Sequence, residues 1–341
     1  MKLSLSVALA ILLGAFSVLG WDPFGWWMVS LLGYAGLFWL VVNSRTAWRA
    51  GLLGLVFGVG LHLFGSGWIF GALHGKAGMG LIPAMASTLV FVVYLALFTA
   101  LPCLSWRALF KSEKNCAGAD CYSMPLSFAA IAAFPALLTL GEWARSLFFN
   151  GFTSLSLGYS LIDTWLAGYA PALGLFGLSW IGFCMSVLLV VLFTAPRSIK
   201  ISSMIIFLAI SGAGLALQQL SWTQAYGAPL SYRLVQSNVS QERKFDPSYM
   251  RQQTQRLVEA IGHQSADLVA TSETALPMFL NELPDGALSN LQQFTRRTAS
   301  HVFLGVATIA ANSDGHNSVL HISPSQHGIS QYNKVQLMSF G

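Results

Sequence analysis

The sequence has few charged residues. Only 9 % of its 341 residues are Asp, Glu, Lys or Arg, whereas 55 % are apolar. A soluble domain carries about 25 % charged residues, so this composition excludes a wholly soluble protein. The mean hydropathy of +0.61 agrees, and the composition predicts an integral membrane protein.

Cysteine is also scarce, and no cysteine follows residue 184. This distribution excludes an extracellular module held together by disulfides. Cys116 and Cys121 form a C-x4-C pair, but no histidine or second cysteine pair lies near it, so two free thiols fit better than a metal site. We therefore expect neither a metal nor another cofactor.

The whole net charge of +5 belongs to the apolar half. Residues 1–219 contain 10 Lys and Arg against 5 Asp and Glu, whereas residues 220–341 contain 8 of each. Basic residues between apolar runs indicate membrane orientation. No basic stripe points to a nucleic-acid partner.

Seven runs are long and apolar enough to suggest membrane-spanning helices, which need about 20 such residues. They are approximately 3–20, 25–42, 50–71, 79–102, 124–141, 168–194 and 201–219. With a cytoplasmic N-terminus, eight Lys and Arg fall in inside segments and two in outside loops. We expect a polytopic helical domain over residues 1–219, with everything after residue 219 outside the cytoplasm. The first run also resembles a signal peptide, but no A-x-A cleavage site follows it, which favours a retained helix.

Two features of the apolar half have competing explanations. Gly54 and Gly58 form a small-xxx-small pair that favours close helix packing over a functional role. Glu142 and Arg145 stand at i and i+3, where the two side chains could form an ion pair. That pair could hold a phospholipid headgroup, but a structural role is the more common explanation.

The polar half predicts a layered α/β domain over residues 220–341. Its elements follow the order β-α-β-α-β-β-β, and the first helix begins with Asp246 as N-cap and Pro247 at its first position. The expected strands are "YRLVQSNV", "ADLVATSE", "HVFLGVATIA", "NSVLHIS" and "ISQYNK", with a second helix over 285–299.

Two residues of this half could carry chemistry. Glu273 in "ATSETALP" ends a strand, where ligands bind in open α/β sheets, and an apolar setting there would raise its pKa toward that of a general base. Lys334 could stabilise an oxyanion. Taken alone, a solvated Glu273 and a Lys334 at a sheet edge are the simpler interpretations.

Motifs in both halves resemble one family. In the polar half these are "LVQSNVSQERKFDP" (234–247), "SETALP" (272–277) and "YNKVQLMSFG" (332–341). In the apolar half they are "GSGWIFGALHGKAGMG" (65–80), "GEWARSLFFNGF" (141–152) and "LAGYAPALGLFGLSWIG" (166–182). Together they resemble the apolipoprotein N-acyltransferases, the membrane branch of the nitrilase superfamily, over essentially the whole chain.

The resemblance implies a fold, a place in the cell and a reaction. It implies a bundle of about seven spans in the bacterial inner membrane, followed by a nitrilase-like α/β sandwich facing the periplasm. A Glu-Lys-Cys triad would take an acyl chain from a phospholipid as a thioester and pass it to the α-amine of a diacylglyceryl apolipoprotein. Glu273 matches the general base, and Lys334 matches the lysine that stabilises the oxyanion.

The nucleophile is the main departure from the family pattern. No cysteine follows Cys184, so the sequence predicts a sandwich cut short before its catalytic cysteine and a chain that forms no acyl-enzyme by itself. A non-catalytic lipid- or lipoprotein-binding membrane protein is the main alternative, and a transporter is a third. Nitrilase action on soluble substrates is disfavoured by the seven runs.

Overall fold

The computed structural model describes residues 2–110, 127–149, 151–309, 315–325 and 329–335. The chain divides into two compact units, the first ending at Gln224 and the second beginning at Ala225. The Cys116 and Cys121 pair lies outside the described residues.

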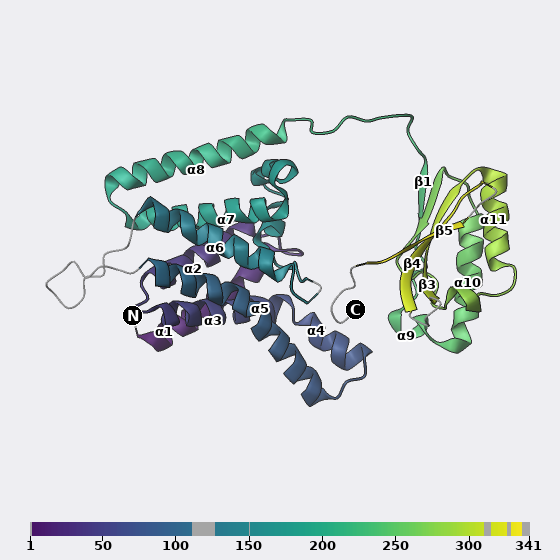
Figure 1. Ribbon diagram of the computed structural model, residues 1–341, viewed down its shortest axis with the longest axis horizontal. Helices are drawn as coiled ribbons and strands as arrows, with labels where there is room; N and C mark the ends of the chain where they lie inside the picture. Colours follow the sequence, from purple (N-terminus) through teal and green to yellow (C-terminus); the bar gives the residue numbers. More distant parts are fainter. Residues whose placement is uncertain (1, 111–126, 150, 310–314, 326–328, 336–341) are drawn as a thin grey trace. The chain divides into compact units, whose positions relative to one another are not determined.

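The first unit is helical (Figure 1). Its helices are α1 (Leu3–Ser17), α2 (Trp27–Val42), α3 (Ala47–Gly65), α4 (Trp68–Gly71), α5 (Leu81–Leu109), α6 (Phe128–Arg145), α7 (Ala170–Thr194) and α8 (Arg197–Gln218). Short helical turns add η1 (Val18–Gly20), η2 (Ala72–Lys76), η3 (Leu157–Leu161) and η4 (Trp165–Tyr169).

Each of the seven apolar runs overlaps a helix. Fewer than seven of the described helices, however, have the length and composition of a membrane span. Among the described residues five do so: α1 with η1, α3, α5, η4 with α7, and α8. Helix α2 has 16 residues and is shorter than a usual span. The predicted run 50–71 is interrupted, because α3 ends at Gly65 and α4 starts at Trp68.

Close packing of α3 on α5 explains the two glycines of α3. A Cβ atom on Gly54 would lie 2.8 Å from the Thr99 carbonyl oxygen, and one on Gly58 would lie 2.8 Å from Ala96 Cα. The two backbones could not approach so closely with any larger side chain. The predicted packing role of Gly54 and Gly58 is therefore confirmed.

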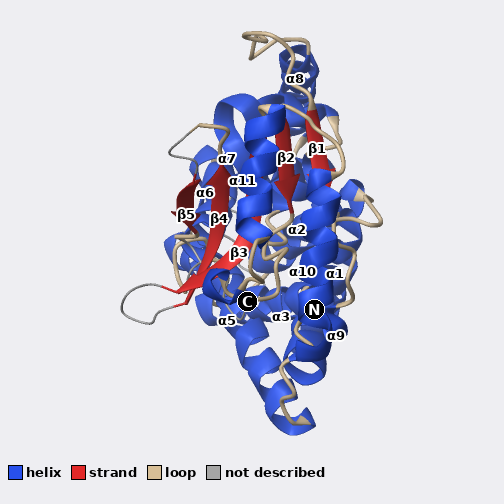
Figure 2. Ribbon diagram, turned by 90° about the vertical axis from the view of Figure 1, so that its right-hand side faces the viewer, coloured by secondary structure: helices blue, strands red, loops and turns tan. Residues whose placement is uncertain are grey.

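The second unit is a five-stranded mixed sheet in the order β1-β2-β3-β4-β5 (Figure 2). Strands β1, β2 and β3 are parallel, and β3, β4 and β5 are antiparallel. The strands are β1 (Tyr232–Val235), β2 (Leu268–Thr271), β3 (His301–Ile309), β4 (Gly315–Ile322) and β5 (Ile329–Asn333). The helices are α9 (Gln241–Lys244), α10 (Pro247–Gly262) and α11 (Ala287–Thr298), with the turn η5 (Leu280–Glu282). The predicted β-α-β-α-β-β-β order is confirmed.

Helices α10 and α11 lie side by side on one face of this sheet (Figure 1). They bury the alternate strand residues Val269, Val302 and Leu320. Helix α10 starts as predicted, since the Asp246 carboxylate accepts a hydrogen bond from Ser248 N–H at 2.9 Å. The sheet thereby gains one packed face, and the parallel strands end together along one edge.

Candidate active site

Glu273 lies in a tight turn just past the end of β2. Thr274 in this turn has a left-handed φ of 47°. The neighbouring strand β3 has Gly305 here, and a Cβ atom on Gly305 would lie 2.3 Å from the Ser272 carbonyl oxygen. Gly305 N–H also donates to Thr271 Oγ1 at 3.0 Å, and Leu276 N–H donates to the Gly305 carbonyl at 3.1 Å. The missing side chain of Gly305 thus lets the turn lie directly against β3.

Lys334 reaches the same edge of the sheet from β5. Since β5 runs antiparallel to β4, which is itself antiparallel to β3, its end meets the ends of the parallel strands. Lys334 N–H donates to the Asn317 carbonyl at 2.8 Å, and Lys334 Nζ lies 2.8 Å from Glu273 Oε1. The structure therefore brings the two sequence-predicted site residues into direct contact across 61 residues of chain.

Asn317 is a site residue that the sequence reasoning missed. Its side-chain amide donates a hydrogen bond to Glu273 Oε1, and its carbonyl holds Lys334 in place. Asn317 lies inside β4, although asparagine is depleted in strands. The sequence did carry one signal for this residue, namely an asparagine within a predicted strand. Residues that do not suit their secondary structure are often found at functional sites.

The electrostatics of Glu273 differ from the expected apolar setting. Its side chain is 61 % exposed and that of Lys334 is 37 % exposed. The hydrogen bonds from Lys334 and Asn317 lower the pKa of the Glu273 carboxyl, outweighing the partial burial that raises it. The expected rise in pKa is therefore wrong. The carboxylate stays ionised at neutral pH and can accept a proton from a nearby thiol or amine.

The cysteines that the structure describes lie in the helical unit. Cys103 is buried on α5 and Cys184 is partly buried on α7. Within the described ranges, no three His, Cys, Asp or Glu side chains are placed to hold a metal ion. The second unit thus contributes a carboxylate, an ammonium group and an amide to the candidate site.

Glu142 and Arg145 are both buried at the end of α6, but they do not pair directly. Glu142 Oε1 accepts a hydrogen bond from Leu157 N–H at 2.9 Å. Arg145 bonds to His62 Nε2 at 3.1 Å and donates to Ser156 Oγ at 3.0 Å. Both side chains are described, and no nitrogen–oxygen contact of 4.0 Å or less joins them. The two charges interact, but they form no direct salt bridge, because partners from α3 and the 156–157 segment take these groups. This favours a structural role.

Comparison with known proteins assigns both units. Residues 13–188 match the model of the apolipoprotein N-acyltransferase N-terminal domain, and residues 232–340 match the carbon-nitrogen hydrolase model. Apolipoprotein N-acyltransferases of Ralstonia nicotianae and Chromobacterium violaceum are 32 % and 30 % identical over 100 % of this chain and 63 % of their own length. That of Nitrosomonas europaea is 30 % identical over 97 % of this chain and 64 % of its own. The chain thus spans somewhat less than two thirds of these curated relatives. The first model alone covers more than half of the 341 residues, and the chain belongs to the apolipoprotein N-acyltransferase family.

Proposed function

We propose that the protein functions in the N-acylation of bacterial lipoproteins. An acyl chain would move from a phospholipid to the α-amine of a diacylglyceryl cysteine. The observation that carries the proposal is the 2.8 Å contact between Glu273 and Lys334. It lies in the region that matches the carbon-nitrogen hydrolase model.

The geometry suits two steps of acyl transfer through a thioester. The Glu273 carboxylate takes the proton of a cysteine thiol, and the thiolate attacks the phospholipid ester carbonyl. The Lys334 ammonium stabilises the negative charge on the tetrahedral oxygen. The lysophospholipid alkoxide leaves with the proton held by Glu273. The lipoprotein amine then attacks the thioester carbonyl and loses a proton to Glu273, the C–S bond breaks, and the released thiolate takes that proton back.

We further propose that residues 1–219 cross the bacterial inner membrane about seven times and that residues 220–341 form part of a periplasmic nitrilase-like sandwich. Five membrane-length helices and the eight-to-two distribution of basic residues support this arrangement. The uncovered face of the sheet supports a sandwich. By strand alternation it presents Tyr232, Leu234, Val319 and Tyr332, all exposed. A second sheet packed on this face would bury them.

The test needs a thiol near Glu273, because residues 225–341 contain no cysteine. A chimera in which residues 1–341 are followed by the unmatched C-terminal part of the Ralstonia nicotianae relative would supply the cysteine that the family resemblance implies. Transfer of a labelled acyl chain from phospholipid to a diacylglyceryl peptide is measured in membranes that contain the chimera. Glu273→Gln and Lys334→Met should each slow transfer at least about a hundredfold.

Glu259→Gln is the matched control, because Glu259 is an exposed glutamate on α10. It should transfer at the rate of the unmodified chimera. Full activity of Glu273→Gln would contradict the proposed roles. Phospholipid binding by the unmodified chimera without any transfer would favour the non-catalytic lipid-binding alternative.

A further inference from the structure

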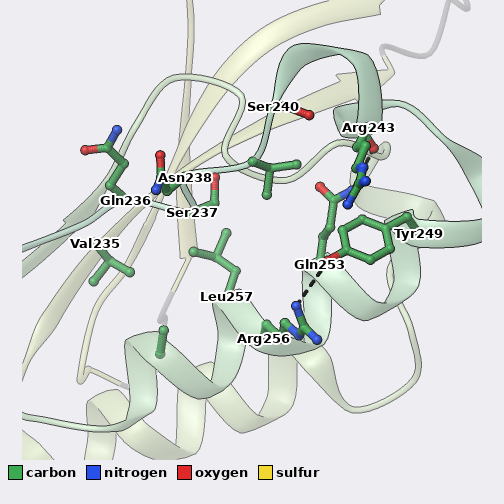
Figure 3. Close-up of a pocket in the computed structure, with 12 residues that line it drawn as sticks. Val235, Gln236, Ser237, Asn238, Ser240, Arg243, Tyr249, Gln253, Arg256 and Leu257 are labelled. Atoms are coloured by element: carbon green, nitrogen blue, oxygen red, sulfur yellow. Dashed lines mark hydrogen bonds between the residues drawn. The ribbon is translucent and has the colours of Figure 1, made fainter.

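A pocket lies where β1 ends, one strand away from β2 and the Glu273 turn. It has a volume of about 510 Å³ and lies between the loop 236–240, Arg243 of α9 and one side of α10 from Tyr249 to Ala260. Figure 3 shows Gln236, Ser237 and Asn238 on one side, Arg243 and Tyr249 on the other, and Leu257 rising between them. A volume of this size is typical of small-molecule sites.

Its lining carries positive charge. Arg243 and Arg256 both line the pocket, and none of the residues shown lining it is acidic. The neighbouring carboxylate of Asp246 accepts hydrogen bonds from Ser248 N–H and Oγ at 2.9 Å and 2.6 Å. This carboxylate caps α10, and its charge also interacts with that of Arg243. Two guanidinium groups against one carboxylate still leave the pocket with a net positive charge that suits an anion.

The structure holds both arginines near the pocket. Arg256 Nη1 donates to Tyr249 Oη at 3.1 Å, and its guanidinium carbon lies 5.9 Å from the Tyr249 ring centroid. The buried amide of Gln253 donates to the Arg243 carbonyl at 2.7 Å and joins α9 to α10. The hydroxyls of Ser237 and Ser240 add further donors to the lining. This is the mixture of charged and neutral donors that a phosphate group accepts from.

Apolar side chains also line the pocket, among them Val235 and the buried Leu257. A free anion gains nothing from these side chains, whereas glycerol and the first carbons of an acyl chain bury apolar surface against them. The lining therefore suits a phosphate attached to an apolar group.

We propose that this pocket binds the phosphate of a phospholipid headgroup, with Arg243 and Arg256 as its ligands. The assignment to the acyl donor rests on the proposed function. Val235 pairs with Thr271 in the register of β1 and β2, so the pocket begins one strand away from the turn that holds Glu273. Lys244, next to Arg243, is near enough to contribute to the lowered pKa of Glu273. In a phospholipid the glycerol backbone alone joins the phosphate to the ester carbonyl, so the proposal has one lipid reach from the pocket to Glu273.

Binding of dihexanoylphosphatidylethanolamine to the full chain in detergent tests the proposal. Arg243→Gln and Arg256→Gln should each raise Kd about tenfold, because each removes charged hydrogen bonds to the phosphate. Arg256→Lys should recover part of the affinity. Arg251→Gln is the matched control: it removes an exposed arginine from the same helix without touching the pocket, and should leave Kd unchanged.

Two further ligands separate the sources of phosphate. Dihexanoylglycerol, which has no phosphate, should bind with a Kd that does not depend on the two arginines. Inorganic phosphate that binds as tightly as the lipid, with the same dependence on the arginines, would overturn the lipid assignment. Unchanged lipid binding by the Arg243→Gln/Arg256→Gln double variant would overturn the site itself. Glu273→Gln should retain binding, so a failure of the proposed chemistry would not be mistaken for a failure of this pocket.

Discussion

At the scale of single residues, Asn317 connects the two halves of the candidate site. Its carbonyl anchors the Lys334 backbone, and its side chain donates to Glu273. Asn317→Ala removes only the second contact, so Lys334 should stay in place while the carboxylate loses one donor. We expect acyl transfer by the chimera to fall about tenfold, the value of one hydrogen bond to a charged group.

Asn290→Ala is the control for this prediction, since Asn290 is an exposed asparagine on α11. It should leave transfer unchanged. A wild-type rate for Asn317→Ala would show that Lys334 alone suffices to position Glu273.

The pH dependence of stability follows from the lowered pKa of Glu273. The ionised carboxylate stabilises the folded state above its ordinary pKa, and this contribution is lost as pH falls through the lower folded-state value. Because Glu273 is 61 % exposed, solvent screening limits the contribution to at most about 1 kcal/mol.

Hydrogen exchange of β2 and β5 peptides can measure this contribution. The unmodified protein should be better protected than Glu273→Gln at about pH 7, and the difference should shrink as the pH falls below the ordinary pKa of a glutamate. A difference that stays constant over this range would mean that the ion pair does not stabilise the fold.

At the scale of elements, β3 and the Glu273 turn fit together only because residue 305 is glycine. In Gly305→Ala the new Cβ atom would overlap the Ser272 carbonyl, and backbone on both sides must move. We expect a loss of about 1–3 kcal/mol in unfolding free energy. Acyl transfer by the chimera should fall by more than the loss of folded protein accounts for, because Glu273 also moves away from Lys334.

Gly262→Ala provides the comparison, since a Cβ atom there has no neighbour within 4 Å. Thermal unfolding and acyl transfer should both stay close to those of the unmodified chimera. Full stability and activity of Gly305→Ala would refute the close approach.

The elements themselves could be predicted from the sequence because they depend on local patterns. Apolar runs gave the helices of the first unit, and the Asp246 cap with Pro247 marked the start of α10. Tertiary partners could not be predicted in this way. Glu142 and Arg145 have ideal helical spacing, yet distant groups take their hydrogen bonds. The role of Asn317 likewise depends on β5 returning beside β4.

At the scale of the whole molecule, the orientation of the chain in the membrane depends on how Lys and Arg are distributed between the two ends of its helices. Helix α8 has 22 residues and rises about 33 Å, enough to cross the roughly 30 Å bilayer core. Arg197 and Lys200 lie in its first turn, and no basic residue lies in its last turn. The positive-inside rule therefore predicts that its start lies in the cytoplasm and its end outside.

Cysteine labelling in intact cells can test this orientation, in a background where all four native cysteines are replaced. Ser221→Cys, just past α8, should react with a membrane-impermeant maleimide. Ser198→Cys, at the other end of the same helix, should react only after the cells are lysed; both serines are exposed. Labelling of Ser198→Cys but not of Ser221→Cys in intact cells would show that the chain has the opposite orientation. Such a result would place Glu273 and Lys334 in the cytoplasm, away from lipoproteins exported across the membrane.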